Sequence, residues 1–275
     1  MKRLLFIILI IILAGCGKPI PPIPPIPPLP ETDSVYRAFL VGVSKYYYFD
    51  SLNLPSPALN TEKLEILFNE ARFGEDNRTF STIVRLTNYD ATKEAILNGI
   101  LEVFADADDD DVSYFYYMGH GKVVQNCPVI TPTDYATTFS SMISVHELEE
   151  TLRQVKGTKV ILLETCHSGS FIEKGIGDFP SMTIEIFANQ PIDFLNKNNY
   201  QVLCSSAGDE VSYDNRYGGS YFCRYFIEGC KDLLADINYD GIIDLNEIYQ
   251  YIKNNVSIQT VQIFPDGSTF PIYEK

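Results

Sequence analysis

Five short apolar runs recur along the chain, and segments with helical spacing separate most of them. The runs lie near residues 36–43, 80–86, 112–118, 159–164 and 201–206. Strands that alternate with helices usually form a parallel sheet, because a connection between parallel strands is long enough to hold a helix. The sequence therefore predicts an α/β fold with a mostly parallel central sheet and helices on both faces.

The helices are expected over residues 57–70, 91–104, 144–155 and 219–235. Asp90 is a candidate cap for the second helix. Ser144 and Glu147 fit a capping box at the start of the third.

Two strand ends carry residues suited to nucleophilic catalysis. Cys166 follows the apolar run 159–164 and precedes His-Ser-Gly-Ser, while His120 stands between two glycines just past the run 112–118. Reactive side chains in open α/β sheets collect at the carboxyl ends of strands. A buried inert thiol and a core histidine are the plain alternatives. The small polar surroundings favour a cysteine nucleophile with a histidine as its proton carrier.

These two segments resemble those of the caspase-like cysteine peptidases, and Glu-Thr-Cys-His-Ser-Gly is most similar to bacterial metacaspase-type members of the peptidase C14 caspase domain. Residues 37–46, 131–134 and 202–206 agree with that family. The resemblance covers residues 34–256 and implies a caspase-like three-layer sandwich.

The resemblance also implies a cysteine endopeptidase that needs no cofactor for catalysis. The Cys166 thiolate would attack a peptide carbonyl, and His120 would protonate the leaving amine. Backbone N–H groups of Gly121 and Cys166 would form the oxyanion hole. His167 is expected to be a loop residue outside the catalytic set, and His146 is expected at the surface.

Glu164 occupies the position that lines the first specificity pocket in metacaspases, where aspartate is commoner. The resemblance therefore implies a peptide or protein substrate that is cleaved after Arg or Lys. A buried carboxylate is costly without a cationic partner. A structural ion pair within the chain is the alternative interpretation of Glu164.

Two other functions stay open at this point. One is a catalytically inactive caspase-like domain that acts as a calcium-stabilised surface binding module. The other is a peptide ligase or transpeptidase that uses the same thioester intermediate.

Residues 236–247 match the twelve-residue calcium loop of an EF-hand. Gly241 would make the sharp turn of this loop. The ligands would be Asp236, Asn238, Asp240, the Ile242 carbonyl, Asp244 through water, and Glu247. We expect bound Ca²⁺ to be structural more than regulatory. The alternative is that Asp244 and Glu247 only form a capping box that begins a helix.

Residues 1–15 are typical of an export signal, with a positive start and an apolar run too short to span a bilayer comfortably as a mature helix. Leu13–Cys16 resembles the bacterial lipoprotein processing box, which predicts a lipid on Cys16 and an exported, membrane-anchored protein. An ordinary signal peptide or an uncleaved anchor is the alternative. Gly17 resembles the pattern that lets lipoproteins leave an inner membrane.

The predicted domain boundaries follow from composition. Residues 16–33 form a linker whose proline-rich part, 19–30, favours polyproline II and a spacer of about 37 Å. A ligand for a proline-reading module is the alternative. The peptidase domain would span residues 34–256 and a tail residues 257–275.

The chain has 36 acidic and 21 basic side chains and a formal charge of −15, which excludes nucleic acid as a favoured partner because phosphates would be repelled.

Asp106–Asp111 is expected to be a solvated turn, with metal binding as the alternative. Residues 172–199 are expected to be an active-site loop or an insertion. Cys223 and Cys230 would lie about 10 Å apart on one helix, too far apart to form a disulfide.

Overall fold

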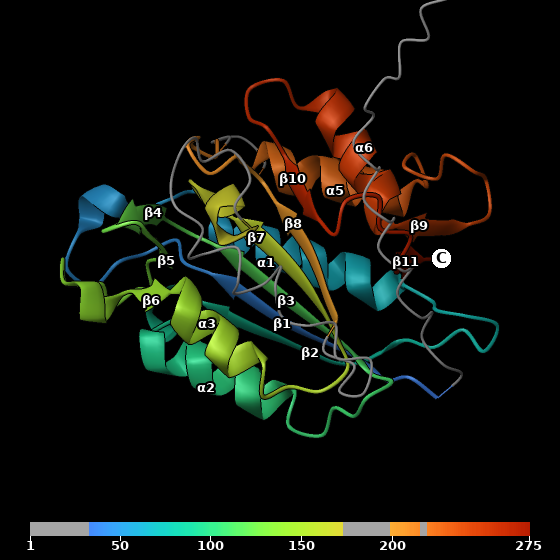
Figure 1. Ribbon diagram of the computed structural model, residues 1–275, viewed down its shortest axis with the longest axis horizontal. Coiled ribbons are helices and arrows are strands. Elements are labelled where there is room, and N and C mark those ends of the chain that lie inside the picture. Colours follow the sequence, from blue (N-terminus) through green and yellow to red (C-terminus); the bar gives the residue numbers. More distant parts are fainter. Residues whose placement is uncertain (1–32, 173–198, 215–218) are drawn as a thin grey trace, which may run out of the picture.

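The computed structural model describes residues 33–172, 199–214 and 219–275 (Figure 1). The predicted export signal, the lipid site at Cys16 and the proline-rich linker therefore lie outside the described residues. So does nearly all of the loop expected over residues 172–199.

A six-stranded sheet runs through the centre of the molecule in the order β10-β8-β7-β3-β1-β2 (Figure 1). Five of its strands are parallel, and β10 pairs antiparallel with β8 at one edge. The strands are β1 (Tyr36–Gly42), β2 (Phe80–Thr87), β3 (Val112–Met118), β7 (Thr158–Glu164), β8 (Asn199–Cys204) and β10 (Gln262–Phe264). The predicted parallel sheet is confirmed.

Helices cover both faces of this sheet, as predicted (Figure 1). One face carries α1 (Pro57–Glu70), α5 (Tyr221–Lys231) and α6 (Leu245–Asn255). The other face carries α2 (Lys93–Val103) and α3 (Val145–Leu152). The Ser144–Glu147 capping box is present, but Thr92 caps α2 in place of Asp90, which ends a short 3₁₀ turn. Further 3₁₀ turns are η1 (Asp50–Leu52), η2 (Asn88–Asp90), η3 (Phe139–Ser141) and η4 (Ser168–Ile172).

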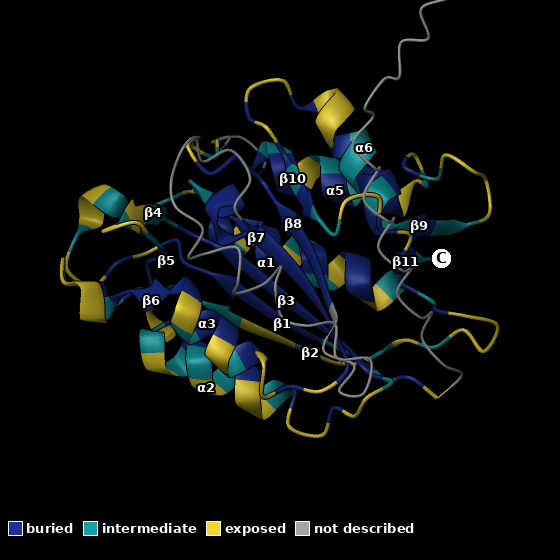
Figure 2. Ribbon diagram, viewed as in Figure 1, coloured by how far each residue is buried: buried dark blue, intermediate teal, exposed yellow. Residues whose placement is uncertain are grey.

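Two apolar cores lie on opposite faces of the sheet (Figure 2). Successive side chains of a strand point to opposite faces, so Tyr116 and Met118 of β3 enter the core under α1 and α5, whereas Phe115 and Tyr117 enter the core under α2 and α3. Every residue of β3 and β7 is buried. These two strands form the rigid centre from which the loops at their carboxyl ends extend.

Two small antiparallel sheets flank the main one. The first contains β4 (Gly121–Val124), β5 (Cys127–Ile130) and β6 (Ile143–Ser144), and it lies next to α3. The second pairs β9 (Ile242–Asp244) with β11 (Pro271–Glu274).

Residues 257–275 are part of the domain, contrary to the expected tail. β10 completes the main sheet, and β11 holds the loop 236–247 through β9. The Glu274 carbonyl and carboxylate accept hydrogen bonds from the N–H groups of Arg72 and Gly74, at 2.9 and 2.8 Å. The described domain therefore extends to the end of β11, not to residue 256.

The acidic run Asp106–Asp111 is mostly exposed, but its last member is buried. Asp111 forms a 2.6 Å ion pair with Arg37 and accepts a hydrogen bond from the Val35 N–H group, so it ties β1 to β3. Cys223 and Cys230 are both buried on α5 as free thiols. Among the described residues, we find no helix with the length and apolar character of a membrane span.

Candidate active site

Cys166 and His120 lie at neighbouring strand ends. In the parallel register of β3 and β7, Met118 pairs with Glu164, so His120 and Cys166 each follow this pair by two residues. Adjacent strands are about 4.8 Å apart. The structure therefore brings the two predicted catalytic residues together at the carboxyl ends of two central strands. We call residues 119–121 and 165–167 the strand-end site.

Gly121 makes the two halves of this site fit together. A Cβ atom at this position would overlap the Thr165 hydroxyl and would lie 2.7 Å from the Cys166 carbonyl oxygen. Only a hydrogen atom can occupy that space without moving the backbone. The glycine that follows His120 thus allows the histidine loop to touch the cysteine loop.

The His120 ring is held by a backbone carbonyl. Its Nε2 lies 2.9 Å from the oxygen of Leu52, at the end of η1. A carbonyl can only accept, so this contact assigns the hydrogen to Nε2 and leaves the Nδ1 lone pair free in the neutral ring. The His120 backbone is fixed as well, because its N–H group donates to the Tyr46 hydroxyl and its carbonyl accepts from the Thr131 N–H group.

Burial lowers the pKa of His120, and the nearby Lys122 ammonium lowers it further, while the Leu52 carbonyl acts in the opposite direction. The imidazole is therefore mainly neutral at pH 7, since even an unperturbed histidine titrates near pH 6.5. A neutral imidazole with a free Nδ1 can accept a proton from a thiol.

Cys166 is half-buried, and its Sγ lies 3.9 Å from the carbonyl oxygen of Ser212. Hydrogen bonds from the loop after β8 hold the turn that carries this cysteine. Ser168 and Ser206 each donate a backbone N–H to the other's hydroxyl, and the Ser206 hydroxyl donates to the Thr165 carbonyl at 3.1 Å. Cys166 is thus positioned by buried serines from two neighbouring strand ends.

His167 is occupied by the loop around it. Its Nδ1 lies 2.9 Å from the Gly208 carbonyl, its N–H group donates to the Glu210 carbonyl, and its φ is +60°. This geometry matches the expected role of His167 as a loop residue. His146 is exposed at the start of α3.

Glu164, two residues before Cys166, is buried and forms no ion pair with the described residues. Its Oε2 accepts hydrogen bonds from the Tyr116 hydroxyl at 2.6 Å and from the Asn60 amide at 3.4 Å. Its Oε1 has no hydrogen-bond partner among the described residues. Burial raises the pKa of Glu164 to about 7, although the Ser220 and Tyr116 hydroxyls oppose the increase.

A second carboxyl group lies close to Glu164 and was not predicted from the sequence. The negative charge of Asp214 helps to raise the pKa of Glu164. One Asp214 oxygen accepts from the Ser56 N–H group, and the other is buried without a described partner. The carboxyl groups of Glu164 and Asp214 therefore lie close enough to interact electrostatically, on the α1 and α5 face of the sheet.

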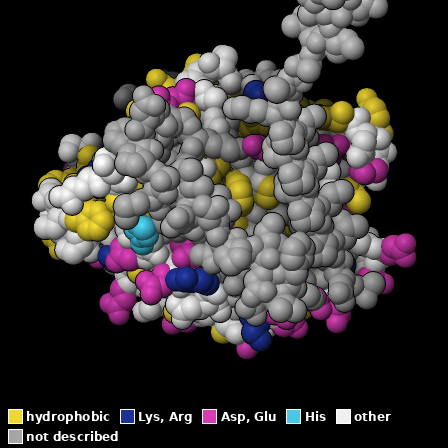
Figure 3. All heavy atoms as spheres, viewed as in Figure 1, with side chains coloured by type: hydrophobic (Ala, Val, Ile, Leu, Met, Phe, Trp, Pro, Cys, Tyr) yellow, Lys and Arg dark blue, Asp and Glu magenta, His cyan; other side chains and the backbone are white. Residues whose placement is uncertain are grey.

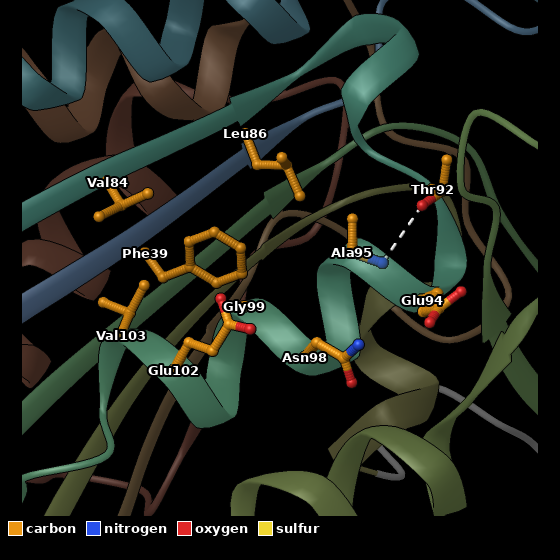
Figure 4. Close-up of a pocket in the computed structure, with 10 residues that line it drawn as sticks. All are labelled: Phe39, Val84, Leu86, Thr92, Glu94, Ala95, Asn98, Gly99, Glu102 and Val103. Atoms are coloured by element: carbon orange, nitrogen blue, oxygen red, sulfur yellow. Dashed lines mark hydrogen bonds between the residues drawn. The ribbon is translucent and has the colours of Figure 1, made fainter.

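Two hollows open on the opposite face. One, of about 370 Å³, adjoins the strand-end site and is lined by Phe49, Ser51, Leu52, His120, Gly121, Lys122, Thr131, Tyr135 and Thr137. The other, of about 500 Å³, lies between β2 and α2, and Figure 4 shows Phe39, Val84 and Leu86 around it, with Glu94 and Glu102 on the helix. The second hollow contains none of the predicted catalytic residues.

The loop 236–247 is held by hydrogen bonds between its own side chains and backbone. Asp236 accepts from the N–H groups of Asp240 and Gly241, and Glu247 accepts from those of Ile237, Asn238 and Asp244. Asp244 caps α6 in a capping box with Glu247. Among the described residues, no three His, Cys, Asp or Glu side chains converge as metal ligands. The predicted calcium ligands are thus on one loop but are bonded to its backbone.

Adjacent parallel strands that end in a cysteine and a neutral histidine define an α/β domain equipped for nucleophilic thiol chemistry. The family model of the caspase domain, peptidase C14, matches residues 36–274, and the chain belongs to this family of cysteine peptidases. Among solved structures, the chain is similar to protein GSU0716 from Geobacter sulfurreducens, with a TM-score of 0.63 and 16% sequence identity over 87% of this chain and 97% of that chain. At this identity the likeness supports the fold alone. A comparison with curated proteins found no match.

Proposed function

We propose that this protein is an active cysteine endopeptidase that cleaves peptide bonds after Arg or Lys. The observation that carries the proposal is the buried Glu164, which lies two residues before the nucleophile and lacks a cationic partner among the described residues. A guanidinium or ammonium group from a substrate would supply the missing charge and hydrogen bonds.

The reaction begins when His120 Nδ1 accepts the Cys166 thiol proton and the sulfur attacks the scissile carbonyl carbon. The carbonyl π electrons move to the oxygen, where N–H groups of Gly121 and Cys166 would stabilise the negative charge. When the oxyanion collapses, the C–N bond breaks and His120 protonates the departing amine. Water then hydrolyses the thioester, with His120 accepting its proton, and the acid product and the free thiol are released.

The charge of the whole molecule also supports a basic substrate. The chain carries a formal charge of −15, and Figure 3 shows acidic side chains gathered along the lower edge of the visible face. Such a field attracts cationic segments and raises their association rate at low salt.

The decisive experiment compares fluorogenic peptides that end in Arg, Lys or Asp before the fluorophore. Wild type is expected to cleave the Arg and Lys peptides, and Cys166→Ala is expected to lose at least about 1,000-fold in kcat/KM, because the nucleophile is gone. Cys127→Ala is the matched control, since it removes a half-buried thiol from β5. Equal rates with Asp, or full activity in Cys166→Ala, would contradict the proposal.

The same assay separates the alternative functions. An inactive binding module would show no turnover in well-folded protein. A ligase or transpeptidase would give amide products when an amine nucleophile is added, because the amine would compete with water for the thioester.

We also propose a structural Ca²⁺ site at residues 236–247, on the support of the loop motif. Asp236, Asn238, Asp240 and Glu247 would hold the ion with the Ile242 carbonyl and with Asp244 through water. Bound Ca²⁺ would fix the connection between α5 and α6. The proposed membrane tether at Cys16 is supported by residues 1–17 of the sequence.

A further inference from the structure

We propose that the hollow beside His120 binds the first substrate residue after the scissile bond, and that Lys122 selects an acidic side chain there. This inference rests on the proposed peptidase function and extends it to the leaving-group side of the substrate.

The position of the hollow indicates which part of a substrate it would hold. His120 and Gly121 both line it, so it opens directly at the group that protonates the departing amine. The residue that carries this amine must lie against His120 when the C–N bond breaks. A cavity of about 370 Å³ at that point is large enough for one side chain.

The Glu164 carboxyl group lies on the other face of the sheet. Glu164 contacts Tyr116, which belongs to the core under α1 and α5. The hollow is bordered by Phe49, Leu52 and Tyr135, which pack with the core under α2 and α3. A peptide that crosses the strand-end site would therefore direct the side chains on either side of its scissile bond toward opposite faces of the sheet.

The charge in the hollow comes from Lys122 on β4. Its Nζ donates to the Tyr135 hydroxyl at 2.6 Å, and among the described residues it has no carboxylate partner. Lys93 on the same side of the sheet, by contrast, is paired with Glu147 at 2.6 Å. In a chain with 36 acidic side chains, an unpaired half-buried lysine beside the reacting groups is a site for an anion.

The surroundings of Lys122 fit an Asp or Glu side chain better than a bare anion. Phe49, Leu52 and Tyr135 provide apolar contact for methylene groups, while the ammonium and the Tyr135 hydroxyl can hydrogen-bond to a carboxylate. The favoured bond is therefore one between a basic and an acidic residue, with the basic residue on the acyl side.

Internally quenched peptides test this inference. They carry Arg before the scissile bond and Asp, Glu, Ala or Lys after it, and an Arg fluorogenic peptide without a residue at that position serves as the reference. We expect kcat/KM for Asp and Glu to exceed that for Lys by about tenfold at low salt, since a partly exposed ion pair has an effect of this order. Lys122→Glu should reverse the order of Asp and Lys.

Lys156→Glu is the matched control, because it makes the same charge change at an exposed position. Lys156 precedes the first residue of β7, whereas the strand-end site follows the last residue of that strand. It should keep the wild-type ratio of Asp to Lys. Equal cleavage of all four peptides by wild type would overturn the inference, and so would a ratio that survives Lys122→Glu. Failure to cleave even the reference peptide would instead overturn the proposed function, and the inference with it.

Discussion

The strand-end site and the loop 236–247 both match a sequence motif closely, yet they use their polar atoms differently. Around the strand-end site, Glu164 Oε1 and an Asp214 oxygen are buried without described partners, and Lys122 has no described carboxylate beside it. In the loop, Asp236 and Glu247 each accept two or more backbone hydrogen bonds.

The strand-end site thus has buried polar atoms that a ligand could hydrogen-bond. The carboxylates of the loop 236–247 already have hydrogen-bond partners within the loop. Unpaired buried polar atoms are costly, and a protein that keeps them at one place gains by binding a complementary group there. The loop loses little if nothing binds, because its own backbone already supplies the partners. We therefore expect large functional effects at the strand-end site and small effects on stability at the loop.

Among substitutions that keep Cys166, the largest effect is expected from Gly121→Ala. The new Cβ would push the histidine loop away from the Thr165 side chain and the Cys166 backbone, and a displacement of about 1 Å can lower turnover roughly 100-fold. The matched change is Gly241→Ala in the loop. The φ of Gly241 is +83°, and a Cβ atom added there would have no other heavy atom within 4 Å. That variant should lose about 1 kcal/mol of unfolding free energy from backbone strain and keep its peptidase activity.

Kinetics with the Arg fluorogenic peptide and urea denaturation measure both variants. The comparison fails if Gly121→Ala retains wild-type turnover, or if Gly241→Ala loses turnover without a change in stability.

An intermediate effect is expected from Glu164→Gln, which should lower peptidase activity and raise the free energy of unfolding at pH 8. Cleavage after Arg should fall about 10- to 100-fold because a charge-assisted contact is lost. The folded-state pKa of about 7 lies above the usual 4.5, so the wild-type protein loses stability as the pH rises between these values. The glutamine variant lacks this loss and should be more stable than wild type at pH 8, by about 3 kcal/mol.

Urea denaturation at pH 4.5 and pH 8 tests the second part. Asp209→Asn, in the loop after β8, is a control for removal of one exposed carboxylate. A glutamine variant that is less stable than wild type at both pH values would show that Glu164 is held by hydrogen bonds rather than strained by burial.

The smallest effect is expected from calcium. At 10 mM Ca²⁺ and a Kd of about 1 mM, binding to the folded loop would stabilise the domain by about 1.4 kcal/mol and raise Tm by about 3 °C. The double variant Asp236→Asn, Glu247→Gln should abolish the increase, and Mg²⁺ should not reproduce it. Identical melting curves with Ca²⁺ and with chelator would leave the loop as a helix cap only.

The long strands and helices could be predicted from the sequence because the hydrophobic pattern of each segment is enough to identify it. β3 and β7 each contain a continuous run of apolar or aromatic residues, and α1 begins and ends at the predicted residues. β4, β6 and β9 have no comparable signal because they contain only two to four residues each and depend on their partners for pairing. β10 was missed for the same reason, since only its antiparallel pairing with β8 identifies it as a strand.

The candidate site divides in a similar way. Cys166, His120 and Glu164 lie in motifs and were predicted. Asp214 and Lys122 were not, because an isolated acidic or basic residue carries no pattern. Asp214 acquires its role only when the loop after β8 folds against Ser56, and Lys122 when β4 places it beside Tyr135.

The carbonyl of Leu52 orients the imidazole of His120, and this has a consequence for mutagenesis. Every amino acid supplies the same carbonyl, so an alanine scan of η1 would leave the contact intact and would miss its importance. Only a change in the path of the main chain, such as removal of one residue from the segment between Tyr46 and Leu52, would withdraw the acceptor and free the ring to adopt the other tautomer. The orientation of the His120 ring therefore depends on the length of this loop and not on the identity of residue 52.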